Sequence, residues 1–214
     1  MAPRISRRRF VHVPLCVAAI AVPLALSMSD AFAQVIEYES NGEKYQTLTR
    51  AGLTVIFTHL PAQVAGFGLL QVSIANGSQI HWTVKPEQFE YVRAGETITA
   101  TSADDVVNTM MARASSNDVI KLITSYEKSL YAIPNMRSNN GYEQRRQNAL
   151  AFGGSPKIKA AAAASAITLA QIRIAPGDST DGAVFLKLTK DLKALTGGHV
   201  EMHVDNETFQ FNPD

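Results

Sequence analysis

Residues 66–92, GFGLLQVSIANGSQIHWTVKPEQFEYV, decide the fold of this 214-residue chain. Apolar and polar residues alternate twice in this stretch, and a period of two is typical of a half-buried β-strand. The apolar positions of the first strand are Leu70, Val72 and Ile74. Those of the second strand are Ile80, Trp82 and Val84. Gln71 and Ser73 are expected on the polar face, and a third short strand is expected after Pro86. The stretch therefore predicts a core and not a site.

Asn76-Gly77 separates the two strands, and this dipeptide usually forms a two-residue hairpin turn. In that register Val72 would oppose His81, so the two apolar rows would lie on opposite faces of the sheet. Burial of one large apolar side chain contributes about 1.5–3 kcal/mol, so the six apolar residues outweigh one preferred turn. We therefore predict that the tight hairpin does not form. Either a longer loop shifts the register by one residue, or the strands lie in different sheets and never pair.

The first 33 residues have the pattern of a cleavable export signal. A basic start with four Arg precedes an apolar run at residues 13–26, and Ala31-Phe32-Ala33 is an A-x-A cleavage site. The apolar run is shorter than the roughly 20 residues of a membrane span, although an uncleaved anchor is the alternative. We expect the exported chain to begin at Gln34, without stable membrane insertion.

Residues 6–12, SRRRFVH, resemble the twin-arginine export signal of bacteria. Paired arginines also occur in ordinary secretory signals, so both export routes, Sec and twin-arginine, stay open. Cys16 is the single cysteine of the chain and lies inside the apolar run, so it does not have the position of a lipoprotein cysteine. The exported protein is therefore expected to contain neither disulfide nor thiol.

The charge of the chain changes when the signal is removed. Without the four Arg and one Asp of residues 1–33, 16 Lys and Arg face 18 Asp and Glu, a net charge of −2. This balance favours neither nucleic acid nor an anionic membrane as a partner. Residues 34–214 are long enough to form one domain around its own core.

The hydrophobic period changes from two to a helical one between residues 102 and 166. Ser102 is the predicted cap of a first helix, and Ser116 or Asn117 that of a second. The apolar face of the second helix is Val119, Leu122, Ile123, Tyr126 and Leu130. A weaker helix is predicted at residues 142–152. The alanine run at residues 160–164 is either a short helix or a flexible joint.

About nine short strands surround this helical segment, so the sequence predicts a mainly β fold, α+β by content. Residues 72–78, 84–89, 174–179 and 182–185 resemble uncharacterised secreted bacterial proteins with an immunoglobulin-like fold. The resemblance implies an immunoglobulin-like β-sandwich, here with a helical insertion at about 102–166, and export. It implies no activity, and the immunoglobulin cysteine pair is absent.

His199, Glu201 and His203 alternate along one predicted strand and therefore share a face. Imidazole and carboxylate are usual zinc ligands, so these three residues are the candidate metal site. The alternative is an ordinary solvated face opposite Val200 and Met202, and the sequence shows no further ligand.

Motifs of catalysis are missing from the sequence. Ser125 and Lys128 have S-x-x-K spacing, but the K-T-G element of penicillin-interacting enzymes does not occur. Neither G-x-S-x-G, H-E-x-x-H nor a phosphate-binding glycine loop is present. We therefore expect no cofactor and no enzyme activity.

The favoured interpretation is an exported interaction or structural module whose helical insertion contacts a protein partner. A small-molecule or metal-binding periplasmic module and an unrecognised hydrolase are the alternatives. An apolar patch around Met110, Met111 and Tyr126 would favour the first, and a deep polar pocket the others.

Overall fold

The computed structural model describes residues 34–134, 141–151 and 153–213. Of these residues, 41% are in strands and 29% in helices, so the predicted mainly β class is confirmed. The predicted export signal and its cleavage site lie outside the described residues. None of the helices in the described ranges is long and apolar enough to cross a membrane.

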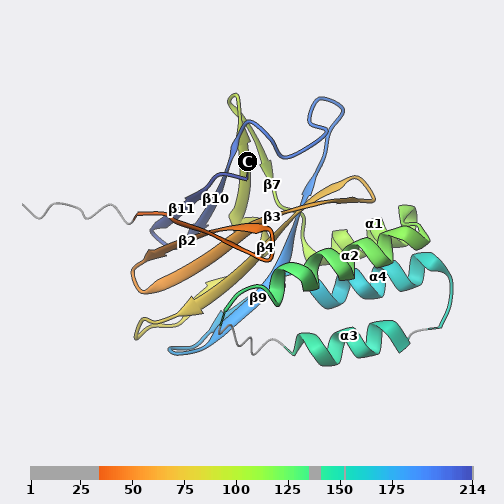
Figure 1. Ribbon diagram of the computed structural model, residues 1–214, viewed down its shortest axis with the longest axis horizontal. Helices are drawn as coiled ribbons and strands as arrows, with labels where there is room; N and C mark the ends of the chain where they lie inside the picture. Colours follow the sequence, from red (N-terminus) through yellow and green to blue (C-terminus); the bar gives the residue numbers. More distant parts are fainter. Residues whose placement is uncertain (1–33, 135–140, 152, 214) are drawn as a thin grey trace, which may run out of the picture. The chain divides into compact units, whose positions relative to one another are not determined.

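A five-stranded antiparallel sheet forms the centre of the fold (Figure 1). Its first four strands are consecutive and are joined by two-residue turns at residues 41–42, 51–52 and 65–66. Both residues of each turn have positive φ, the geometry that matches the twist of a hairpin. In spatial order the strands are β1 (Ile36–Ser40), β2 (Glu43–Arg50), β3 (Leu53–Val64), β4 (Phe67–Asn76) and β9 (Ser179–Lys187).

Two smaller antiparallel sheets complete the β structure. The two-stranded sheet pairs β5 (Trp82–Val84) with β8 (Ile172–Ile174), and a 3-10 turn, η1 (Pro86–Gln88), follows β5. The four-stranded sheet has the order β11 (Glu207–Phe211), β10 (His199–Val204), β6 (Phe89–Arg93) and β7 (Glu96–Thr99).

The four helices follow β7 and precede β8, in the segment where the sequence predicts them. Ser102 Oγ accepts a hydrogen bond from the Asp105 N–H, as predicted for the first cap. The second cap is Ser115 and not Ser116 or Asn117, because Asp118 is the partner that completes its capping box. The helices are α1 (Ala103–Arg113), α2 (Ser116–Leu130), α3 (Tyr142–Ala151) and α4 (Pro156–Ile167). The alanine run is therefore a helix, part of α4, and not a joint.

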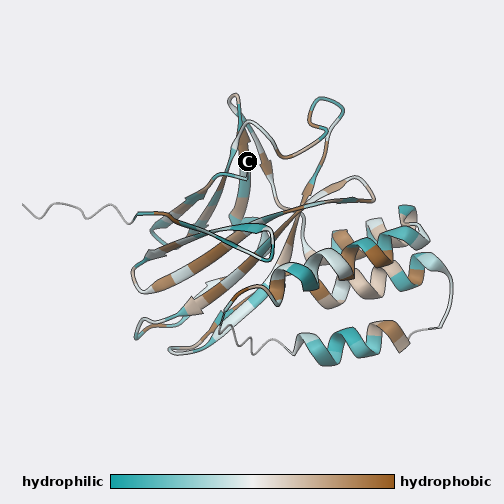
Figure 2. Ribbon diagram, in the orientation of Figure 1, coloured by the Kyte–Doolittle hydropathy of each residue, from teal (hydrophilic) through white to brown (hydrophobic). Residues whose placement is uncertain are grey.

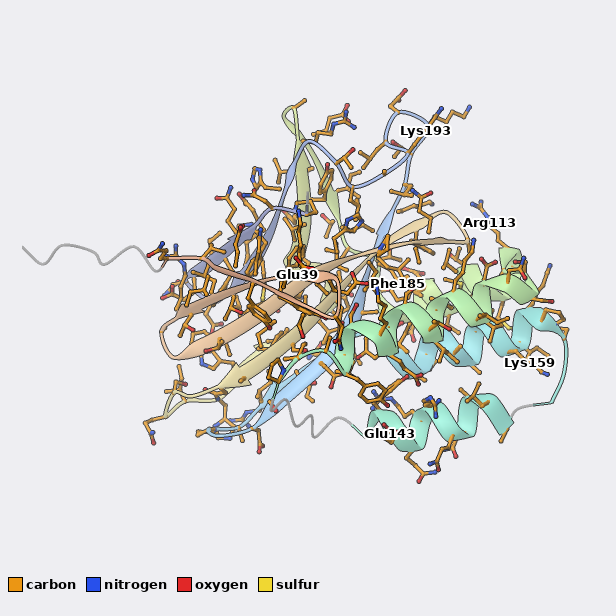
Figure 3. The ribbon with its side chains drawn as sticks, in the orientation of Figure 1. Glu39, Arg113, Glu143, Lys159, Phe185 and Lys193 are labelled. Carbon is orange, nitrogen blue, oxygen red and sulfur yellow. The ribbon has the colours of Figure 1, made fainter. Side chains whose placement is uncertain are left out.

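Two hydrophobic clusters lie on opposite faces of the five-stranded sheet. The first joins side chains such as Val72 to Trp82 of β5 and Met202 of β10. The second joins Leu69 of β4 and Phe185 of β9 to the helices. Phe185 lies between β9 and the helices (Figure 3), where its ring meets Phe67 edge to face at 5.7 Å. The helices α1, α2 and α4 thus form a helical layer over the sheet.

The prediction of a half-buried β4 is wrong, because the helical layer covers its second face. Gln71 and Ser73, expected in solvent, are each 1% exposed. A period of two indicates that the two faces of a strand differ in polarity, but it does not predict what packs on the polar face.

The prediction that Asn76-Gly77 forms no tight hairpin is confirmed. β4 pairs with β3 and β9, whereas β5 pairs with β8, so the two strands never pair. Asn76 itself is buried, and its Nδ2 donates to the Ile80 and Ile174 carbonyls. Burial of Ile80 was predicted wrongly: it is 55% exposed in the bend before β5.

Candidate functional site

The predicted metal-site residues share the outer face of β10. The residues between them, Val200 and Met202, are fully buried in the first hydrophobic cluster. His199, Glu201 and His203 therefore lie on the opposite face of the strand. His199 Nε2 lies 2.9 Å from Glu201 Oε1, and His203 Nε2 lies 3.1 Å from Glu201 Oε2. The prediction that these side chains share a face is therefore confirmed, and Glu201 lies between the two imidazoles.

A fourth ionisable side chain joins this group from the neighbouring strand. Glu90 of β6 is directly opposite Glu201, and its Oε2 lies 4.0 Å from His203 Nε2. No local pattern in the sequence indicates Glu90 as a member of this group, because only the β6–β10 register brings together residues more than a hundred positions apart. As the side chains stand, no group of three or more His, Cys, Asp or Glu in the described part of the chain is arranged to hold a metal ion.

The S-x-x-K pair has no catalytic geometry. Lys128 Nζ forms an ion pair with Glu43 of β2, while Tyr126, between Ser125 and Lys128, is fully buried. Lys128 therefore links α2 to β2 of the first hairpin.

A polar contact is buried where α2 meets the central sheet. The Tyr126 hydroxyl donates to Asp181 Oδ2 of β9, and both side chains are at most 2% exposed. Burial, followed by the charge of Asp181, raises the pKa of Tyr126 well above its ordinary value. Both amide atoms of neighbouring Gln71 have no hydrogen-bond partner among the described residues. The Tyr126–Asp181 contact therefore joins α2 to β9 in a region that is closed to solvent.

A groove with a volume of about 390 Å³ lies among α1, α3 and α4. Its apolar wall includes Met111 and Ile158, and its floor is built from small residues of α4 such as Ala161 and Ala162. Arg145 is the single charged side chain among the described residues that line it. An exposed patch around Met110, Met111 and Tyr126, which would favour a protein-binding module, does not form, since Met110 and Tyr126 are fully buried.

The helix α3 borders this groove and is largely hydrophilic (Figure 2). Polar contacts attach it: the Tyr142 hydroxyl donates to Glu127 Oε1 at 2.9 Å, and Arg145 Nη2 donates to the Ala166 carbonyl at 3.1 Å. Leu150, the large apolar residue near its end, is 51% exposed. Little of α3 is therefore committed to the core.

A second cleft, of about 480 Å³, lies beside β1, β2 and β3 and the C-terminal residues Asn212 and Pro213. Both polar atoms of the Gln46 side chain are engaged beside it. Gln46 Nε2 donates to Glu37 Oε1 at 2.9 Å, and Gln46 Oε1 accepts from the Asn212 N–H at 2.7 Å. Gln46 therefore links β1 to the residues that follow β11.

Comparison of the chain with protein-family models, with curated proteins and with solved structures gave no match.

Proposed function

We propose that the protein is an exported, non-enzymatic module that binds another protein through its helical layer. The observation that carries this proposal is the placement of exposed apolar side chains. Seven large hydrophobic residues are exposed among the described residues, and five of them belong to the helical segment. Those five are Met111, Ile120, Tyr131, Leu150 and Ile158.

The partner that fits the groove among α1, α3 and α4 is an amphipathic helix. A floor of alanines lets a helix backbone approach closely, while Met111 and Ile158 supply apolar contacts for its larger side chains. An amphipathic helix binds such a groove through apolar side chains that are three and four residues apart.

The positive charge near the groove favours a partner with acidic residues. Arg145 lines it, and Lys157 and Lys159 flank Ile158. Lys157 Nζ donates to the Ala112 carbonyl, which places the start of α4 beside the end of α1. Arg113 and Lys159 are both seen at this end of the helical layer (Figure 3). Acidic residues beside the apolar anchors of a partner helix would be attracted to these cations.

The finer fold assignment is part of the same proposal. The central and the four-stranded sheets share the first hydrophobic cluster, which supports an immunoglobulin-like sandwich in the broad sense, with residues 102–166 as an insertion. The strands β1–β4 form a meander, whereas immunoglobulin domains distribute consecutive strands between sheets by Greek-key connections. Export with cleavage after Ala33 rests on the pattern of residues 1–33.

Site-specific photocrosslinking in the producing cell tests the interaction. A crosslinker at Met111 or at Ile158 should capture the same protein, and the captured peptide should be an acidic amphipathic helix. A crosslinker at Ile80, an apolar residue outside the helices that is more exposed than either test position, is the control.

Ser165→Trp supplies a second, blocking variant, because Ser165 is exposed and lines the groove. It should abolish the crosslink at Ile158 while leaving the thermal unfolding temperature unchanged. Crosslinks at Ile80 as strong as those at Ile158, or a crosslink that survives Ser165→Trp, would show that the groove is not the binding surface.

A further inference from the structure

Three potential metal donors converge on the outer face of the four-stranded sheet. His203 Nε2 lies 3.1 Å from Glu201 Oε2 and 4.0 Å from Glu90 Oε2. These atoms come from two hydrogen-bonded strands, β10 and β6. We propose that this face binds a divalent transition-metal ion, Zn²⁺, through His203, Glu201 and Glu90.

Each of the three donors is oriented by a contact to its other polar atom. His203 Nδ1 lies 3.1 Å from Thr208 Oγ1 on β11. Thr99 Oγ1 of β7 donates to Glu90 Oε1 at 3.4 Å, and His199 Nε2 holds Glu201 Oε1 at 2.9 Å. Such contacts to the far side of a ligand fix its direction and, for histidine, its tautomer. The remaining oxygen atoms, the Oε2 of Glu90 and of Glu201, therefore both lie within 4.0 Å of His203 Nε2.

The strands that carry these donors form a rigid platform. The inward neighbours of Glu90, Phe89 and Tyr91, are fully buried, as are Val200, Met202 and Val204 on β10. Glu90 and Glu201 are directly opposite on neighbouring strands, and like charges in that position destabilise a sheet. A cation between the two carboxylates removes this repulsion.

The distances suit zinc after a small adjustment. With zinc–ligand bonds of about 2.0–2.2 Å, two ligands of a tetrahedral zinc ion lie about 3.3 Å apart. The His203–Glu201 pair already has this spacing, whereas the His203–Glu90 distance must shorten by about 0.7 Å. The Glu90 side chain is 31% exposed, so rotation about its side-chain bonds closes the gap without moving the strand. Its present distance explains why the group does not stand ready for a metal.

Metal binding requires one tautomer of the neutral His203 imidazole. Its proton lies on Nδ1, facing Thr208 Oγ1 at 3.1 Å, and the lone pair of Nε2 binds the ion. Water completes the coordination on the exposed side. The site is remote from the helical layer, so its success or failure is independent of the proposed function.

Isothermal titration of untagged protein with ZnCl₂ tests the site. We expect one Zn²⁺ per chain, and Glu201→Gln and Glu90→Gln should each weaken binding by at least about 100-fold. Thr208→Val, which removes only the contact to His203 Nδ1, should weaken it by about 10-fold. The matched control is His81→Asn, an exposed histidine before β5, which should bind as the wild type does.

Glu90→Gln decides between a metal site and a row of hydrogen-bonded surface side chains. Unchanged affinity in that variant, or the same loss in His81→Asn, would overturn the proposal, as would the absence of a one-to-one complex. A crystal grown with ZnCl₂ should give an anomalous peak between His203, Glu201 and Glu90. A peak at His199 alone would contradict the assignment.

Discussion

Gly182 of β9 lies against the chain that leaves α4, and no side chain fits there. A Cβ at this position would lie 2.6 Å from Leu169 Cα and 2.8 Å from Leu169 N. Carbon atoms in contact prefer about 3.5–4.0 Å, so the added methyl group overlaps the backbone of Leu169 by about 1 Å. Leu169 is held in place, because its N–H donates to the Ala183 carbonyl at 2.9 Å and its side chain is buried.

The cost of Gly182→Ala follows from this contact. Overpacking of a core costs about 1–3 kcal/mol, and a clash with backbone belongs at the upper end of that range. The replacement of glycine offsets about 0.4–1 kcal/mol of this cost, because alanine lowers the conformational entropy of the unfolded chain. We expect a net destabilisation of about 2 kcal/mol, which lowers the unfolding temperature of a domain of this size by about 4–8 °C.

Urea unfolding followed by the fluorescence of Trp82, the single tryptophan, measures this change. Gly153→Ala is the matched control: its Cβ meets nothing within 4 Å, so its free energy of unfolding should stay within about 0.5 kcal/mol of the wild type. If Gly182→Ala also stays within that margin, the close approach of Leu169 to β9 is wrong.

Three further predictions concern other parts of the chain. Tyr126→Phe should cost about 1.5–3 kcal/mol at pH 7, because the buried Asp181 carboxylate loses a donor. Burial keeps Tyr126 neutral in the folded state, so its contribution is present below pH 10.0 and lost as pH rises toward its raised pKa. At alkaline pH the free energy of unfolding of the variant should therefore fall less steeply with pH than that of the wild type, by up to about 1.4 kcal/mol per pH unit. Parallel curves for the two proteins would contradict the buried phenol. Asn76→Ala should lower the free energy of unfolding by about 1–3 kcal/mol in urea, because the buried amide of Asn76 no longer donates to the Ile80 and Ile174 carbonyls; a neutral effect would show that the loop does not depend on it. Mass spectrometry of the exported protein should find Gln34 at its N-terminus, and a chain that retains residues 1–33 would refute cleavage.

Local signals in the sequence predicted much of the secondary structure. The cap of α1 and the apolar face of α2 depend on neighbours three and four residues away, whereas the cap of α2 was predicted one or two residues too late. The burial of Gln71 and Ser73 depends instead on a helical layer that starts some thirty residues later. The exposure of Ile80 accompanies the hydrogen bonds of Asn76, which accepts from the Ser78 N–H and donates to the Ile80 carbonyl before β5 begins. This turn has a local signal in Asn76-Gly77, whereas the cover over Gln71 and Ser73 has none.

The candidate sites show the same division. Alternation along β10 was enough to place His199, Glu201 and His203 on one face. Glu90 required the β6–β10 register, which a single sequence does not encode in any short motif. The groove depends on how α3 packs beside α1 and α4, and the polar composition of α3 gave no apolar stripe from which to predict that contact.

The order of strands in the central sheet has a consequence for folding. β1 to β4 pair with their sequence neighbours, so this meander closes only short loops and is expected to form early. The pairing of β4 with β9 must close a loop of about 100 residues, a slower step. Until it does, β4 is an unprotected edge strand with an apolar face, a template for intermolecular pairing. The helices folded between β4 and β9 therefore shorten the interval in which a newly synthesised chain is open to aggregation, because each one brings β9 closer to its place.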